Sequence, residues 1–431
     1  MLFSIEKLVY GGDGLARLPG DEHGPGKAVF VPFVLEGESI EGSVLGERPG
    51  FARAHADHIR QASPHRIPPQ CPYFASCGGC HYQHSSYEHQ LEIKAAILKE
   101  TLRRTAKIEL GVDLVVHPSP AWNYRNRSRL RIAGKPDFTL GYYRFNSQDL
   151  LPIEQCPISS PLINRAIATL WSMGRAGNLA GELEEVELFA NSEDTQLLVE
   201  LHGDSGRNPE TATTVAEAVK SALPEVVGVV WFPSALGTRT RPDHPTSILG
   251  SRELRYNTQH FSYRVGAGAF FQGNRYLMDE LIRIVTEGCS GSLAFDLYAG
   301  VGLFSAILSR SFAQVFAVES SSASYADLEV NSAPNVKAVC STTQHFLPGA
   351  RKLRPELIVV DPPRSGLGEA VLAGLEKLGA RSIIYVSCDP ATLARDLRTL
   401  VGAGYAIAQA HLVDLFPQTF HIESVFRLAL A

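Results

Sequence analysis

A cysteine at the end of a strand-like run has the setting of a nucleophile. Cys388 is followed by Asp389 and Pro390 and then by a stretch with helical apolar spacing. Aspartate is a good N-cap residue and proline suits the first helical turn, so a helix should begin directly after Cys388. Because the partial positive charge at a helix N-terminus stabilises a thiolate, we predict a nucleophile with a lowered pKa. The alternative is a buried, gap-filling cysteine, which is our interpretation of Cys289 and Cys340.

Two candidates for a proton acceptor lie near the C-terminus. His421 and Glu423 are two residues apart and precede the strand-like run Val425-Phe-Arg-Leu. Side chains two apart on an extended chain share one face, so both would point toward the same site. The alternative is that they are solvated residues at a strand edge.

A glycine-rich turn predicts a cofactor site. The apolar run that contains Asp296 leads through Gly300 and Gly302 into an apolar helical stretch, a turn that lets backbone approach a ligand. A dinucleotide site would need a further glycine where the sequence has Ser305, and Asp296 would repel a pyrophosphate. Glu319 ends the next predicted strand, where an acidic residue accepts hydrogen bonds from ribose. The pattern favours cationic S-adenosylmethionine over NAD; the alternative is a tight turn without a ligand.

Four cysteines form a candidate metal site. Cys71, Cys77 and Cys80 are separated by five and then two residues, and Cys156 lies far downstream. Seven cysteines in a chain of 431 residues do not resemble a secreted disulfide framework. Four thiolates suit an iron–sulfur cluster or zinc equally well by count, and Gly78-Gly79 lets backbone amides approach bound sulfur.

A row of arginines indicates contact with RNA. The chain has a net charge of −5, yet residues 51–150 hold 14 Lys and Arg against 8 Asp and Glu, a local charge of +6. Within this segment Arg125, Arg127, Arg129 and Arg131 alternate with other residues, so a strand would present all four on one face as a phosphate track. The alternative is a set of intramolecular ion pairs.

The elements that position these residues predict a multidomain α/β protein. Residues 1–60 alternate short apolar runs with glycine turns, as in a small OB-like β-barrel. Residues 61–262 begin with a proline-rich linker and a helix over 87–107, and read as a central α+β domain. Residues 263–431 alternate helices and strands, as in a Rossmann-like, doubly wound parallel sheet. We expect helices at 213–223, 274–287 and 303–310, and strands at 186–189, 196–201, 293–297, 315–318, 357–360 and 383–386.

Composition and the N-terminus limit the class of protein. Hydrophobic residues make up 45% of the chain and charged residues 20%, which excludes disordered and collagen-like proteins. No apolar stretch is long enough to span a membrane, and the first residues lack the apolar core of a secretory signal. We therefore expect a cytoplasmic enzyme without a membrane partner.

Four motifs occur in a fixed order. They are Phe295-Asp-Leu-Tyr-Ala-Gly-Val-Gly, Asp361-Pro-Pro-Arg-Ser-Gly, Ser387-Cys-Asp-Pro-Ala-Thr-Leu-Ala-Arg-Asp and Phe416-Pro-x-Thr-x-His-x-Glu. In these motifs the chain resembles the RNA uracil-5-methyltransferases over nearly its whole length. Within that family it is similar to the ribosomal RNA enzymes that carry an N-terminal TRAM barrel and a [4Fe-4S] cluster. The resemblance implies that 263–431 is the S-adenosylmethionine-dependent methyltransferase domain.

The resemblance also implies roles for particular residues. Cys388 attacks C6 of the target uracil and makes C5 nucleophilic enough to take a methyl group, and Glu423 then removes the C5 proton. The implied contacts to S-adenosyl-L-methionine are Gln272, Tyr298, Gly300, Glu319 and Asp361. The implied ligands of the [4Fe-4S] cluster are Cys71, Cys77, Cys80 and Cys156.

Two departures from the family pattern keep other functions open. Leu303 stands where the ribosomal enzymes often have asparagine, and Ser341-Thr342 stands where a Gly-Asp pair commonly contacts adenine. The expected activity is formation of 5-methyluridine in RNA, in 23S ribosomal RNA rather than transfer RNA, with no obligate protein partner. The alternatives are a transfer RNA enzyme, a non-catalytic iron–sulfur factor that binds RNA, and cytosine-5 methylation.

Overall fold

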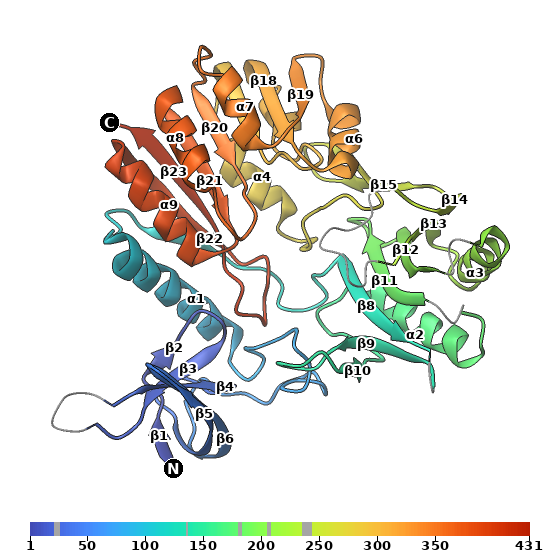
Figure 1. Ribbon diagram of the computed structural model, residues 1–431, viewed down its shortest axis with the longest axis vertical. Helices are drawn as coiled ribbons and strands as arrows, with labels where there is room; N and C mark the ends of the chain where they lie inside the picture. Colours follow the sequence, from blue (N-terminus) through green and yellow to red (C-terminus); the bar gives the residue numbers. More distant parts are fainter. Residues whose placement is uncertain (21–25, 135–136, 180–182, 205–207, 235–243) are drawn as a thin grey trace.

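The computed structural model describes residues 1–20, 26–134, 137–179, 183–204, 208–234 and 244–431 (Figure 1). Its first part is all-β. The strands are β1 (Leu2–Ser4), β2 (Lys7–Leu8), β3 (Asp13–Arg17), β4 (Ala28–Pro32), β5 (Ser39–Arg48) and β6 (Phe51–Gln61). They form one six-stranded sheet in the order β1-β5-β6-β4-β3-β2, over a small core that includes Phe3, Val29 and Ile40. The predicted all-β character of residues 1–60 is observed.

A seven-stranded sheet forms the central part. Its strands are β8 (Arg127–Ala133), β9 (Thr139–Tyr143), β10 (Leu150–Pro152), β11 (Leu183–Ala190), β12 (Leu197–Gly203), β13 (Val226–Phe232) and β14 (Ser247–Gly250), in the order β10-β9-β8-β11-β12-β13-β14. The helices α2 (Pro161–Arg175) and α3 (Pro209–Ala222) pack on it. The expected strand at 186–189 lies within β11. The expected strand at 196–201 and the expected helix at 213–223 lie within β12 and α3, except that β12 begins one residue later and α3 ends one residue earlier.

The C-terminal part is built on an eight-stranded sheet. Its strands are β7 (Leu114–His117), β17 (Gly291–Leu297), β18 (Phe312–Glu319), β19 (Val336–Cys340), β20 (Leu357–Val360), β21 (Ser382–Ser387), β22 (Tyr405–Val413) and β23 (Glu423–Leu430). The order is β19-β18-β17-β20-β21-β23-β22-β7, and the five strands from β19 to β21 are parallel. A hairpin of β15 (Glu253–Asn257) and β16 (Ser262–Gly266) precedes this part.

Helices cover both faces of this sheet (Figure 1). They are α4 (Met278–Thr286), α5 (Ser305–Leu308), α6 (Ser322–Asn331), α7 (Thr343–Gly349), α8 (Glu369–Leu378) and α9 (Pro390–Gly402). Alternate residues of the strands point to opposite faces of the sheet and enter two separate cores. Phe295 and Ile358 lie in the core with α8 and α9, whereas Ala294 and Val359 lie in the core with α4. The prediction of a doubly wound parallel sheet is therefore confirmed.

Some expected elements are shorter than the sequence suggested. The helix expected over 87–107 is α1 (Tyr87–Thr101) followed by a π-helical turn at Leu102–Ala106. The helix expected from 274 begins at Met278, because the Asn274 side chain accepts hydrogen bonds from the amides of Tyr276 and Leu277 and forms a turn first. The helix expected over 303–310 keeps only Ser305–Leu308.

A segment of the expected central domain packs with the C-terminal domain instead. Strand β7 pairs in parallel with β22, and the apolar side chains of α1, such as Ile97 and Leu98, enter the same core as α9. Residues 87–117 therefore belong to the C-terminal part, and the prediction of one continuous central domain over 61–262 is corrected. This segment joins the C-terminal part because the apolar face of α1 packs in the core between α9 and the C-terminal sheet. No helix of the described residues is long and apolar enough to cross a membrane.

Candidate active site

The residues predicted to do chemistry meet in one cavity at the carboxyl ends of the parallel strands. This cavity of about 730 Å³ is lined by both expected catalytic residues, Cys388 and Glu423. It is also lined by all five expected cofactor contacts, which are Gln272, Tyr298, Gly300, Glu319 and Asp361. The strand ends of β17, β18, β20 and β21 supply most of them, and β17 is flanked by β18 and β20, where the strand order reverses. Open α/β sheets bind ligands at such a point.

The glycine-rich turn after β17 shapes one wall of the cavity. Tyr298, Gly300 and Gly302 have φ of 65°, 57° and 93°, in the left-handed region. The Gly300 amide donates a hydrogen bond to Oε2 of Glu319 (2.9 Å), and the amides of Ser320 and Ser321 donate to Oε1. These bonds fix the carboxylate of Glu319 at the cavity wall, where it accepts hydrogen bonds.

Two buried carboxyl groups lie beside this turn. Asp296 accepts a hydrogen bond from the Ser305 amide (2.8 Å), whereas its other oxygen, Oδ1, has no hydrogen-bond partner among the described residues. Burial raises the pKa of Asp296 to about 7. Burial and the neighbouring Asp296 also raise the pKa of Asp361 to about 7. A cationic ligand would relieve both effects, since a positive charge favours the ionised carboxylates.

Cys388 has the predicted position but not the predicted pKa. Helix α9 begins at Pro390, and the Asp389 side chain caps it by accepting hydrogen bonds from the amides of Ala391 and Thr392. Burial, followed by the charges of Glu423 and Asp361, raises the pKa of the Cys388 thiol to about 12. The prediction of a lowered pKa is therefore wrong for this structure, because burial of the thiol, together with the charges of the two carboxyl groups, outweighs the effect of the helix N-terminus.

Glu423 is the first residue of β23 and is 2% exposed. Its Oε1 has no hydrogen-bond partner in the part of the chain that the structure describes. Burial and the charge of Asp361 raise its pKa well above the usual value, and the charge of Arg364 opposes that rise. A buried carboxyl group with an unused oxygen facing a cavity is suited to accept and release a proton.

His421 lines the same cavity beside an arginine. An Nη2 atom of Arg364 lies 3.4 Å from the ring nitrogens of His421. Burial and the charge of Arg364 lower the pKa of His421 to about 3, so the imidazole is neutral at physiological pH. Arg364 belongs to the Asp361-Pro-Pro-Arg motif, so the sequence contains a signal for this residue, although we did not predict it as part of the site.

The N-terminal sheet contributes a residue that sequence reasoning missed. The Tyr10 hydroxyl donates a hydrogen bond to the backbone oxygen of Cys388 (3.4 Å). Its ring packs edge-on against Phe420, with 5.5 Å between ring centroids. Tyr10 stands before Gly11-Gly12 in a turn of the first sheet, and nothing in that local sequence points to a site in the last domain.

The loop over residues 414–422, which precedes Glu423, forms hydrogen bonds with helix α1 and with the cysteine-rich segment. Lys94 is buried and bonds Oδ1 of Asp414 (2.6 Å) and the backbone oxygen of Phe416 (2.9 Å). The amide group of the Gln90 side chain binds Gln418, whose backbone oxygen also accepts a hydrogen bond from the His81 amide. Segments far apart in sequence therefore fix the loop before Glu423.

The four candidate metal ligands converge. Cys71, Cys77, Cys80 and Cys156 line one cavity of about 330 Å³. The Gly79 amide donates a hydrogen bond to the Cys77 sulfur (3.4 Å), the kind of backbone approach that the glycine pair predicted. The donor set and the cavity fit a group with several thiolate ligands.

Three of the four arginines in the row form intramolecular ion pairs. Strand β8 begins at Arg127, so Arg125 lies before it in an isolated bridge. Arg127 and Arg129 both pair with Glu187. Arg131 pairs with Glu185 (2.9 Å). The strand pairing of β8 with β11 brings these acidic residues opposite the arginines. The alternative of intramolecular ion pairs therefore describes the chain as it is folded, and contact with RNA stays a prediction.

Comparisons with known proteins agree with this geometry. Residues 86–430 match the tRNA (uracil-5-)-methyltransferase family. An uncharacterised RNA methyltransferase of Halalkalibacterium halodurans is 29% identical over 99% of this chain and 96% of its own. One of Thermotoga maritima is 30% identical over 98% of each chain.

A solved structure has the same fold. The tRNA (uracil-54, C5)-methyltransferase of Pyrococcus abyssi, in complex with S-adenosyl-L-homocysteine, superposes with a TM-score of 0.77 over the whole of both chains, at 24% identity. The family match covers the sheet, the cavity and the motifs at its strand ends. The chain thus belongs to the RNA uracil-5-methyltransferase family.

Proposed function

We propose that this enzyme methylates C5 of a uridine in RNA through a covalent bond between Cys388 and C6 of the uracil. The observation that carries the proposal is the shared cavity: a thiol and a buried carboxyl group with an unused oxygen line the same space at the ligand-binding ends of the strands. Uracil C5 is a poor nucleophile until a thiolate adds to C6, so both groups are needed within reach of one base.

S-Adenosylmethionine is the proposed methyl donor, and when bound it supplies the methyl group as an electrophile. Gln272, Tyr298, Gly300, Glu319 and Asp361 would hold it. The carboxylate of Glu319 suits ribose hydroxyls, and the buried carboxyls of Asp296 and Asp361 suit a positively charged group. The complex of the Pyrococcus abyssi protein with S-adenosyl-L-homocysteine supports this choice.

The protein groups then have separate roles. The Cys388 thiol first releases its proton to solvent, and Arg364 is a cation close enough to lower the thiol pKa. The sulfur then adds to C6, and the electrons of the C5–C6 double bond form an enolate that makes C5 nucleophilic. After C5 has taken the methyl group, Glu423 accepts the proton from C5. The electrons of that C–H bond restore the ring double bond as Cys388 leaves. Burial brings the pKa of Glu423 upward from the usual carboxyl value, and a base works best when its pKa lies near the operating pH.

We propose a [4Fe-4S] cluster at the four cysteines, with a structural role. The four cysteines line one cavity of about 330 Å³, and the Gly79 amide donates a hydrogen bond to the Cys77 sulfur, the kind of bond that cluster sulfurs accept from backbone amides. Zinc is the alternative, since four thiolates also form tetrahedral structural zinc sites. Methyl transfer moves no net electrons, so the reaction needs no redox centre.

Anaerobic reconstitution tests the cluster. We expect close to four iron and four sulfide per chain, with a broad absorption band that Cys80→Ser weakens. Stoichiometric zinc without sulfide would contradict the proposal.

We propose ribosomal RNA as the substrate. The four cysteines and the six-stranded N-terminal sheet support it, because the ribosomal enzymes that the sequence resembles carry a cysteine-bound cluster and an N-terminal β-domain. Transfer RNA is the second candidate, favoured by the name of the matching family and by the Pyrococcus abyssi enzyme. Arg125, Arg127, Arg129 and Arg131 remain the proposed RNA contacts, with Arg129 and Arg131 partly exposed at 20% and 23%.

One experiment tests reaction and substrate together. Anaerobically purified enzyme is incubated with S-adenosylmethionine and with ribosomal or transfer RNA from a strain that lacks 5-methyluridine, and the digested nucleosides are quantified by mass spectrometry. We expect 5-methyluridine in ribosomal RNA and none with Cys388→Ala. If 5-methyluridine forms in transfer RNA alone, transfer RNA is the substrate. If the product is 5-methylcytidine, the target base is cytosine. If neither RNA is methylated, the result favours a non-catalytic RNA-binding factor.

A further inference from the structure

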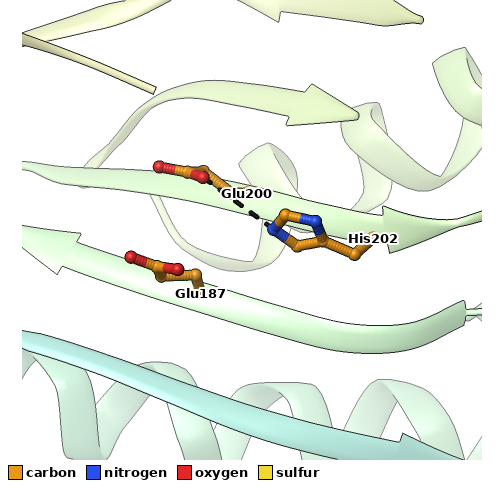
Figure 2. A group of neighbouring side chains, drawn as sticks. All are labelled: Glu187, Glu200 and His202. Carbon is orange, nitrogen blue, oxygen red and sulfur yellow. Dashed lines mark ion pairs between the residues drawn. The ribbon is translucent and has the colours of Figure 1, made fainter. Parts of the chain in front are cut away.

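A second cavity adjoins the proposed active site. It has a volume of about 380 Å³ and shares part of its wall with the first, namely Gly268, Phe270, Phe271, Gln272 and Phe416. Its lining includes Glu187 on β11 and Glu200 and His202 on β12, whose side chains lie close together (Figure 2). The proposed reaction uses none of these three residues, although they line the same cavity as Gln272.

His202 brings an unsatisfied polar group to this cavity. It is 3% exposed, and neither ring nitrogen has a hydrogen-bond partner in the described residues. The ion-pair contact drawn in Figure 2 joins Nε2 of His202 to Oε2 of Glu200 at 3.8 Å, which is too long for a hydrogen bond. Leaving a buried polar group unpaired costs free energy, and a ligand that forms hydrogen bonds with both His202 and Glu200 would remove that cost.

A metal ion does not suit this arrangement, although one ligand atom of each of the three residues lies within 4.8 Å of the others. The negative charges of Glu187 and Glu200 are already balanced by neighbouring arginines. Arg127 pairs with Glu187 and Glu200, and Arg129 pairs with Glu187. A divalent cation would have to enter beside two guanidinium groups that already bind both oxygens of Glu187 and Oε1 of Glu200. A neutral ligand meets no such repulsion.

The remaining walls suit a flat, aromatic ligand. The ring of Phe232 stacks on His202, with 5.3 Å between centroids and 15° between planes. Phe270, at the wall shared with the first cavity, is 66% exposed. Burial lowers the pKa of His202 to about 4, so its neutral ring offers one donor and one acceptor. Glu200 offers an acceptor beside it, with Oε1 already bound by the Gly268 amide (3.1 Å).

We propose that this second cavity binds another nucleobase of the substrate RNA, next to the target uridine, through an N–H group given to Glu200 and a ring nitrogen or carbonyl facing His202. The proposal rests on the proposed function, since it takes RNA to be the substrate. Proteins recognise unpaired bases in single-stranded RNA through hydrogen bonds to the base edges and through stacking on aromatic side chains. The volume is sufficient for one base.

The main test measures binding to short RNAs, once mass spectrometry of nuclease fragments of the methylated RNA has located the modified uridine. Short RNA fragments centred on the modified uridine carry one abasic nucleotide at each flanking position in turn, and affinity is measured by fluorescence anisotropy in a Cys388→Ala background. We expect one flanking position at which loss of the base weakens binding about tenfold or more. In His202→Phe or Glu200→Gln the same abasic fragment should bind no worse than the intact one.

The variants keep the shape of the side chains and so separate binding from folding. His202→Phe retains the ring that stacks on Phe232, and Glu225→Gln serves as the control, since Glu225 pairs with Arg165 (2.5 Å) outside the cavity. The control should retain the tenfold effect. An equal loss at every abasic position in wild-type enzyme and variants would overturn the proposal while leaving methylation intact.

A second measurement needs no methylation. Saturation-transfer NMR with adenosine, guanosine, cytidine and uridine 5′-monophosphates should show contact of base protons with the protein, stronger for one base, and that preference should disappear in His202→Phe. Identical spectra for wild-type and variant would overturn the proposal. So would one equivalent of a divalent metal in the purified protein that both His202→Phe and Glu200→Gln lose.

Discussion

The hydroxyl of Tyr10 donates a hydrogen bond to the backbone oxygen of Cys388, 378 residues further along the chain. The N-terminal sheet thus touches the residue that forms the covalent bond in the proposed reaction. The position of the nucleophile depends on how that sheet is seated against the catalytic sheet, as well as on the strand and helix that flank Cys388.

Removing the Tyr10 hydroxyl should slow the reaction without unfolding the protein. A typical hydrogen bond contributes about 1 kcal/mol, so Tyr10→Phe should lower the single-turnover rate about fivefold. The ring and its contact with Phe420 remain. Circular dichroism should be unchanged, and Tyr276→Phe at an exposed site serves as the control. A rate equal to that of wild-type enzyme would show that the contact does not position Cys388.

The two proposed catalytic residues should fail in different ways. Cys388→Ala cannot form the bond to C6 and should lose all measurable turnover. Glu423→Gln keeps the nucleophile but cannot take the C5 proton, so methylated RNA should remain attached to the protein. A band of enzyme–RNA adduct on a denaturing gel, sensitive to nuclease, would identify it. Normal turnover of Glu423→Gln would refute the assigned base.

The rate should depend on pH through Arg364. Its charge opposes the rise in the pKa of Cys388 and of Glu423, and both groups act in their deprotonated forms. Arg364→Gln should therefore raise both pKa values and move the ascending limb of the pH–rate profile to higher pH. A shift of one pKa unit lowers the rate at pH 7 about tenfold. Arg364→Lys should restore much of the rate, and an unshifted profile in Arg364→Gln would contradict the assignment.

Removing one partner of the buried ion pair between Lys94 and Asp414 should lower the free energy of unfolding. Lys94→Met leaves Asp414 buried without its cation, and we expect a loss of about 3–5 kcal/mol in the free energy of unfolding. Lys94→Met with Asp414→Asn should recover part of this loss. Urea denaturation measures it, with the exposed Lys99→Met on the same helix as control. Equal stability of Lys94→Met and wild-type enzyme would show that the pair does not hold the loop.

Local sequence was sufficient for the parts of the site that lie at strand ends. A strand, a turn and a helix follow one another within a few residues at Gly300 and at Cys388, and such patterns predict both the fold of the segment and the side on which a ligand binds. The doubly wound sheet was predictable for the same reason, since its strands and helices alternate.

Relations between distant segments were not predictable in this way. The pKa of Cys388 depends on two carboxyl groups that reach it only after folding. The arginines of β8 looked exposed because their acidic partners stand on β11, opposite them by strand register. Tyr10 and the pairing of β7 likewise follow from packing between segments, which no local periodicity records.

The pairing of β7 with β22 has a consequence for how the protein is made. Strand β7 leaves the ribosome early, whereas its partner is among the last segments synthesised. Until then the edge of β7 is unpaired and α1 lacks the contacts that it makes with α9, and such exposed edges favour aggregation. A fragment that begins after β7 would leave the edge of β22 open. The catalytic part of this enzyme is therefore inseparable from its beginning, and cutting the chain between the two should yield insoluble halves.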